Sequence, residues 1–234
     1  MWIRHGLLTF LHNYFRMKKI LTAIVLVALG AFSASAQIKD GFGVIGGANY
    51  NKTVYQGRKP IARFGGLGGV TYRYMMPYGF AVQPSLVSNY KSAGSKYVLA
   101  NTDVDKLYNA VGYLEVPVAL SWGIETNGFR VSFSADPFVG YALHCTTEYV
   151  STTTKKTMSN DWSGQNLARF EYGLGAGLGL EYGRMQLKLI YSWNFGSLCA
   201  DSSKTSGETI TMMNAYIYKG NSFKGAQLTF GFFF

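Results

Sequence analysis

The sequence predicts an all-β protein: an eight-stranded antiparallel transmembrane β-barrel with up-and-down topology, following an N-terminal signal peptide. Three observations support this prediction. Eight successive segments alternate apolar with polar or small residues, as strands do when their side chains point to opposite faces. The connections between these segments are alternately short and long. The chain of 234 residues is rich in aromatic residues and glycine, with 17 Tyr, 16 Phe and 28 Gly, which favours strands over helices.

The N-terminus has the features of an export signal. Lys18-Lys19 precedes an apolar run from Ile20 to Gly30, and Ala34-Ser35-Ala36 forms a small-residue cleavage site. The apolar run of about 11 residues is shorter than the roughly 20 needed to span a bilayer, so a cleaved signal is favoured over a retained anchor.

Two parts of the chain are therefore expected. Residues 1–36 form the signal peptide, in which Met17 is the expected initiator and residues 1–16 a mis-assigned extension. Residues 37–234 form one outer-membrane β-barrel domain with 18 basic and 12 acidic residues, because four basic residues and no acid lie in the leader. This modest positive balance, without a basic element interleaved with stacking aromatics, does not indicate a nucleic-acid partner.

The clearest strand runs from Tyr113 to Ile124. Its even positions are all apolar, whereas its odd positions are polar, small or amphipathic. Each segment is about as long as the 9–11 residues that a tilted strand needs to cross a bilayer. In chain order, the other seven segments are Phe42–Tyr50, Phe64–Tyr74, Phe80–Tyr90, Phe129–Leu143, Arg169–Tyr182, Met185–Phe195 and Gln227–Phe234.

The connections favour a membrane barrel over a soluble sandwich. Outer-membrane barrels have short periplasmic turns and long extracellular loops. Asn127-Gly128 adds a hairpin signal in one of the turns. The short connections are 75–79, 125–128 and 183–184, and the long polar ones are 51–63, 91–110, 144–166 and 197–222.

Outward-facing aromatic residues are expected to form two girdles, because amphipathic rings prefer the headgroup zone. The periplasmic girdle comprises Tyr72, Tyr74, Phe80, Trp122, Phe129, Tyr182, Phe232 and Phe234. The extracellular girdle comprises Tyr50, Phe64, Tyr90, Tyr141, Tyr172 and Trp193.

If the apolar faces meet lipid, the opposite faces place a nearly balanced set of charges in the lumen. An eight-stranded barrel has an interior just wide enough for side chains to fill, and buried charges persist when they are paired. The set predicts an ion-pair plug, with a gated proton or ion path as the alternative. Its members are Arg63, Arg73, Glu115, Arg130, Asp136, Arg169, Glu171, Glu181 and Lys188.

Few residues indicate chemistry. His144 is the only histidine after the leader, so a lipid-modifying enzyme that uses it is a minor alternative. Cys145 and Cys199 either pair as a disulfide or stay reduced, and they are too few with His144 for a metal site. No cofactor is expected, because the G-x-G-x-x-G match at Gly41–Gly46 lies inside a strand and opens no helix.

The predicted outer loops are rich in basic residues, which could contact lipid phosphates or simply be solvated. They are Lys52, Arg58, Lys59, Lys91, Lys96, Lys106, Lys155, Lys156, Lys204 and Lys219.

Three stretches resemble the PorT-like outer-membrane β-barrel family of Bacteroidetes: Tyr113–Val118, Pro137–Tyr141 and the glycine-rich hairpin from Tyr172 to Phe195. The terminal Phe230, Phe232 and Phe234 resemble the signature that barrel-assembly machinery recognises. The resemblance implies an outer-membrane location and a part in protein secretion through a type IX system.

The leading hypothesis is therefore a non-enzymatic integral outer-membrane protein, structural or accessory to secretion, with a narrow channel as the first alternative. The expected partners are outer-membrane lipid and lipopolysaccharide, the barrel-assembly machinery and components of a secretion system.

Overall fold

The computed structural model describes residues 38, 40–53, 58–97, 104–151, 155–160, 168–196, 198 and 222–234. The predicted signal peptide and its extension lie outside these residues. Within them, no helix is long and apolar enough to cross a membrane.

The described residues form one antiparallel sheet of nine strands, with a short 3-10 turn, η1 (Pro77–Gly79), between the second and third. The strands are β1 (Gly41–Thr53), β2 (Arg58–Met75), β3 (Phe80–Tyr97), β4 (Val104–Thr126), β5 (Phe129–Ser151), β6 (Lys155–Ser159), β7 (Phe170–Tyr182), β8 (Met185–Asn194) and β9 (Phe223–Phe233).

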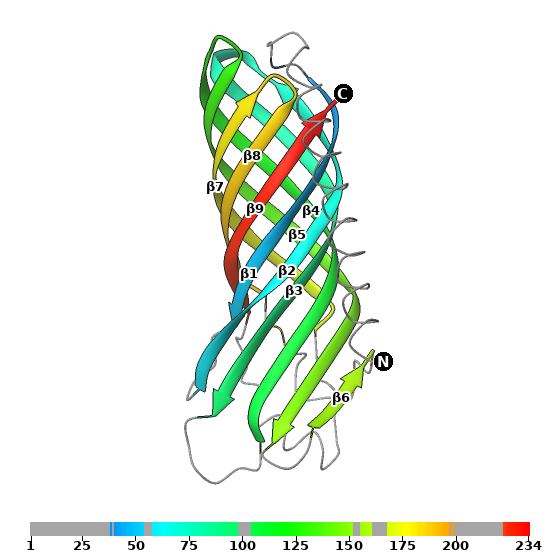
Figure 1. The fold of residues 1–234 in the computed structure, drawn as a ribbon. Coiled ribbons are helices and arrows are strands. Elements are labelled where there is room, and N and C mark those ends of the chain that lie inside the picture. The colour runs from blue at the N-terminus through cyan, green and yellow to red at the C-terminus, as the bar shows by residue number, and fades with distance from the viewer. Residues whose placement is uncertain are drawn as a thin grey trace, which may run out of the picture.

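Eight of these strands close into a barrel (Figure 1). Each is hydrogen-bonded to both neighbours, because β4 pairs with β5 and β9 pairs with β1. The short β6 pairs only with β5, beyond the barrel wall. The predicted eight-stranded antiparallel barrel is confirmed.

The barrel is apolar outside and polar inside. On β7 the side chains alternate strictly between exposed and buried: Leu178 is 51% exposed, whereas Glu171 and Glu181 are each 1% exposed. Large apolar side chains on all eight barrel strands are exposed in the same way. A soluble protein buries such side chains, so this inverted pattern indicates a wall that faces lipid.

The short connections gather at one end of the barrel, here named the turn end, together with the C-terminus (Figure 1). Asn127 and Gly128 both have positive φ, 52° and 75°, as a two-residue hairpin turn requires. Gly183 also has a positive φ, of 54°, in the turn between β7 and β8. The predicted short turns are therefore confirmed.

The opposite end, named the loop end, differs from the prediction. Much of the predicted loops 51–63, 91–110 and 144–166 is strand, because β2, β3, β4 and β5 continue past the barrel. We name the part of β2–β6 that projects there the outer extension, residues 58–62, 91–97, 104–112, 144–151 and 155–159 (Figure 1). Polar residues occupy both faces in several of these segments, so the two-residue hydrophobic period that marks a strand is missing.

Three register shifts mark β-bulges in the described strands. The register of β2 against β3 shifts between Ala62 and Gly66, and that of β4 against β5 shifts between Val104 and Lys106 and between Gly112 and Tyr113. A bulge adds one residue to a strand and so interrupts its alternation. On β2 the neighbours Arg63 and Phe64 are consequently both exposed.

The aromatic residues of the two predicted girdles lie on the outer wall. Cross-strand register brings some into pairs, such as Tyr50 with Phe64, whose ring centroids are 4.7 Å apart. Tyr72 and Phe232 are partly covered, and the other girdle residues are exposed. The hydrocarbon layer is therefore expected between these two levels.

Leu189→Arg tests this placement, because Leu189 lies between Leu178 and Leu228 in the middle of the apolar wall. We expect a loss of about 2–4 kcal/mol in the free energy of unfolding, as for arginine at a bilayer midplane. The control Leu143→Arg lies beyond Tyr141 near the loop end and should cost about 0–1 kcal/mol. Denaturant unfolding in lipid vesicles, followed by tryptophan fluorescence, measures both; equal losses would contradict the placement.

Candidate functional site

The lumen holds most of the predicted interior charges. Seven of the nine are buried there: Arg73, Glu115, Arg130, Asp136, Glu171, Glu181 and Lys188. An eighth charge, Lys91, joins them at 3% exposure. The buried set is therefore balanced, with four basic and four acidic side chains.

Near the turn end, Glu181 joins two arginines. Its Oε2 lies 2.8 Å from Nη1 of Arg73, and its Oε1 lies 2.6 Å from Nη1 of Arg130. Arg130 also donates to the carbonyl oxygen of Gly79 at 3.0 Å, and the guanidinium of Arg73 lies 3.8 Å from the centroid of the Phe233 ring. This cluster ties β2, β5 and β7 together across the lumen.

The middle of the lumen holds a second ion pair, between Lys188 and Asp136. The hydroxyl of Ser134 donates to Asp136 at 2.8 Å. Gln83 and Gln186 exchange two hydrogen bonds of 3.1 and 3.0 Å across the barrel. Asp136, Lys188 and the two glutamines line a cavity with a volume of about 60 Å³, room for only a few water molecules.

Toward the loop end, Lys91 bridges two carboxylates. Its Nζ lies 2.8 Å from Oε1 of Glu115 and 3.0 Å from Oε1 of Glu171. The amide of Asn89 donates to Glu115 at 3.0 Å, and that of Asn194 donates to Glu171 at 2.6 Å. One ammonium and two amides thus contact a pair of neighbouring carboxylates, which would otherwise repel each other.

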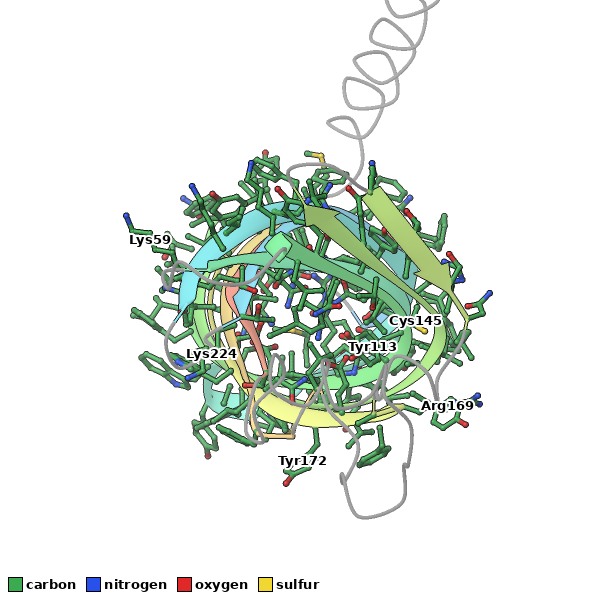
Figure 2. The ribbon with its side chains drawn as sticks, turned by 90° about the horizontal axis from the view of Figure 1, so that it is seen from below. Lys59, Tyr113, Cys145, Arg169, Tyr172 and Lys224 are labelled. Carbon is green, nitrogen blue, oxygen red and sulfur yellow. The ribbon has the colours of Figure 1, made fainter. Side chains whose placement is uncertain are left out.

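An apolar cluster lies at this loop end of the lumen. Tyr113 and Phe138 place their rings against Lys91, with centroids 5.3 and 4.7 Å from its Nζ. Figure 2 shows Tyr113 and Cys145 inside the ring of strands. The cluster consists of Ala93, Val111, Tyr113, Ala142, Cys145, Leu198 and Phe223. The lumen is therefore filled by charged, polar and apolar layers in turn.

Sequence reasoning missed Lys91, which it placed in an outer loop. That prediction was wrong because β3 does not end at Tyr90 but runs to Tyr97. The signal was present in the sequence: Lys91 is in phase with Val87 and Asn89, which both face the lumen.

Arg63 and Arg169 were wrongly predicted to face the lumen, since both are exposed. The bulge in β2 turns Arg63 outward, where its guanidinium lies 4.7 Å from the centroid of the Tyr108 ring. Arg169 lies just before β7, where strand alternation does not apply, and donates to the Tyr141 hydroxyl at 3.3 Å.

The candidate chemical residues are separated by the barrel wall. His144 is exposed, with Nε2 3.2 Å from the hydroxyl oxygen of Thr146, whereas Cys145 is buried in the apolar cluster. Cys199 lies outside the described residues, so its pairing with Cys145 stays a prediction. Among the residues that the structure describes, no group of three or more His, Cys, Asp or Glu side chains could hold a metal ion.

The C-terminal phenylalanines lie on the outer face of β9, with Phe230 49% and Phe234 70% exposed and Phe232 partly covered. The rings of Phe232 and Phe234 meet edge to face, with centroids 5.8 Å apart. Their recognition by barrel-assembly machinery stays a prediction.

Comparison with known proteins agrees with this geometry. A family model described as "Outer membrane protein beta-barrel domain" matches residues 34–200. No curated protein matches the sequence significantly.

Solved structures of small outer-membrane barrels are similar over most of their length. Ail, the attachment invasion locus protein of Yersinia pestis, is 14% identical, with 84% of this chain and 100% of that chain covered and a TM-score of 0.44. Neisserial surface protein A is 13% identical, with 83% and 97% covered and a TM-score of 0.40. OprG from Pseudomonas aeruginosa is 14% identical, with 86% and 99% covered and a TM-score of 0.38.

Glu181→Gln tests the charge network of the lumen. It leaves Arg73 and Arg130 buried without their counter-ion, so we expect a loss of about 3–5 kcal/mol in the free energy of unfolding. The control Glu125→Gln removes an exposed carboxylate at the turn end and should have little effect. Denaturant titration of the refolded barrels compares them; wild-type stability in Glu181→Gln would refute a structural role for this network.

Proposed function

The chain belongs to the outer-membrane protein β-barrel family, and we propose that it acts there as a non-enzymatic, non-conducting barrel that is structural or accessory to protein secretion. It is an integral protein of the bacterial outer membrane, spanned by eight antiparallel strands. The observation that carries the proposal is the filled lumen.

A conducting path would have to cross every layer of the lumen. The Glu181 cluster, the Lys188–Asp136 pair and the Lys91 cluster follow one another along the axis, and the cavity among them holds only about 60 Å³. Separating a buried ion pair leaves an uncompensated charge and costs about 3–5 kcal/mol. The layers therefore support a plug rather than the narrow channel considered from the sequence.

The surroundings of His144 support a non-enzymatic role. A histidine that acts as a general base usually needs a group that orients its ring. Glu148 follows His144 by four residues on β5, but its carboxylate is bound to Lys155 at 3.0 Å. The His144 imidazole instead contacts the hydroxyl of Thr146. Such a contact is expected of a histidine on the polar surface of a strand.

With the lumen filled, the surfaces that remain for partners are those outside the membrane. The outer extension is a paired sheet that projects beyond β1, β7, β8 and β9 (Figure 1). A component of a secretion system that approaches the barrel from the loop end would contact the outer extension. The PorT-like stretches, Tyr113–Val118 among them, suggest the secretion role itself.

Reconstitution into planar bilayers tests the non-conducting barrel. We expect a silent membrane, because the ion-pair clusters of the described residues fill the lumen between its two ends. Protease protection of the same proteoliposomes controls for insertion. Discrete, reproducible conductance steps from the inserted wild-type protein would contradict the proposal and restore the channel alternative.

Deletion of the gene tests the secretion role. We expect fewer secreted and surface-attached proteins, measured by quantitative proteomics, with recovery when a wild-type copy is supplied. A copy carrying His144→Ala should restore secretion equally, because the imidazole has no catalytic task. Unchanged secretion in the deletion strain would remove the accessory role, and failure of the His144→Ala copy would favour an enzyme.

A further inference from the structure

Three lysines form a row across the outer extension. Lys59 lies opposite Lys96 in the pairing of β2 with β3, and Lys96 lies opposite Lys106 in the pairing of β3 with β4. Side chains directly opposite each other share a face, and like charges in that position destabilise a sheet. A row of three ammonium groups is therefore better explained by an anionic ligand than by folding.

This lysine row faces outward, in line with the lipid-facing wall. Along the same β3–β4 ladder, Tyr90 of the extracellular girdle lies opposite Gly112, and Lys96 follows six residues later on the same face. Lys59 and Lys96 are exposed and Lys106 is half-buried. Figure 2 shows Lys59 pointing away from the barrel.

A second group of basic residues, the boundary tier, lies closer to the girdle. Lys52 follows Tyr50 by two residues and is paired in register with Lys224 of β9. Arg63, which contacts Tyr108 of the outer extension, and Arg169, which contacts Tyr141 of the wall, complete the tier. Arg169 also points away from the barrel in Figure 2.

The acids that could neutralise these groups lie elsewhere. Among the described acidic side chains, four are in the lumen, while Asp40 and Glu125 are at the turn end. Of the acids whose side chains the structure describes, Glu148 is the one on the outward face of the loop end, and Lys155 binds it at 3.0 Å. Among the described side chains, six basic residues of the two groups form no ion pair with an acid: Lys52, Lys59, Arg63, Lys96, Lys106 and Lys224.

The depth of the two groups indicates the kind of anion. At about 3.3 Å per residue and a strand tilt near 40°, Lys52 lies about 5 Å beyond the girdle and Lys96 about 15 Å beyond it. The polar zone of a phospholipid leaflet is only about 5–8 Å deep. The boundary tier is therefore at the level of any lipid phosphate, whereas the lysine row is beyond the reach of phospholipid headgroups.

We propose that the boundary tier and the lysine row together bind lipopolysaccharide of the outer leaflet. The boundary tier contacts the phosphates next to its acyl chains, and the lysine row contacts anionic groups on its sugars further from the membrane. Lysine binds phosphate as a point charge, and arginine binds it through a planar pair of N–H donors. This binding depends on the outer-membrane location and not on the secretion role.

The test compares purified, refolded barrels in zwitterionic detergent for binding to rough-form lipopolysaccharide, its dephosphorylated form and phosphatidylglycerol. Replacing Lys59, Lys96 and Lys106 together by glutamine should weaken lipopolysaccharide binding on the order of 100-fold, or roughly fivefold per lysine. Replacing all three by arginine should retain it. The matched control, Arg184→Gln, removes a positive charge from the turn end and should change nothing.

A stability measurement separates binding from folding. Without lipopolysaccharide, the triple glutamine variant should unfold at the same or higher denaturant concentration than the parent, because three facing charges have been removed. Unweakened lipopolysaccharide binding by this variant would overturn the proposal. So would equal binding of the dephosphorylated form, or an equal loss of phosphatidylglycerol binding, which would indicate simple attraction to any anionic lipid.

Discussion

Every backbone N–H and C=O group within a lipid layer must find a partner in the protein, and the pairing of β9 with β1 meets this constraint by closing the sheet. Closure then determines the distribution of side chains. One face of each strand meets lipid and is apolar, while the other meets a lumen just wide enough for side chains to fill. The charged side chains on that inner face consequently have to neutralise one another.

The network in the lumen shows how this neutralisation is distributed. Glu181 serves two arginines and Lys91 serves two glutamates, so neither cluster is neutral alone, and the two together balance. The inward glycines of β7 leave room for these long side chains: a Cβ on Gly177 would lie 3.1 Å from Cε of Lys188. Filling the lumen in this way separates the two ends of the barrel and leaves its outer surfaces for partners.

The fold and most of the residues that line the lumen could be predicted from the sequence, because the two-residue period indicates both the strands and their inward-facing positions. Glu115, Arg130 and Glu181 follow from the apolar residues that flank them. Arg63 could not be placed from the sequence, whereas Lys91 is in phase with Val87 and Asn89 and was misplaced because the end of β3 was set too early. A bulge inserts one residue beside Arg63 without a composition signal, whereas β3 continues past Tyr90 through residues that are polar or small on both faces. Which charges pair with one another depends on the register and tilt of the strands. The periodicity of the sequence does not specify either of them.

The up-and-down topology also has a consequence for how the barrel folds. Pairings such as β2 with β3 and β7 with β8 join strands that are neighbours in the chain, so each can form as a hairpin with little loss of chain entropy. The pairing of β1 with β9 instead joins the two most distant strands of the described fold. Contacts of such high sequence separation form slowly. Closure of that seam is therefore the expected rate-limiting step, and an unfinished sheet would expose two strand edges until it is complete.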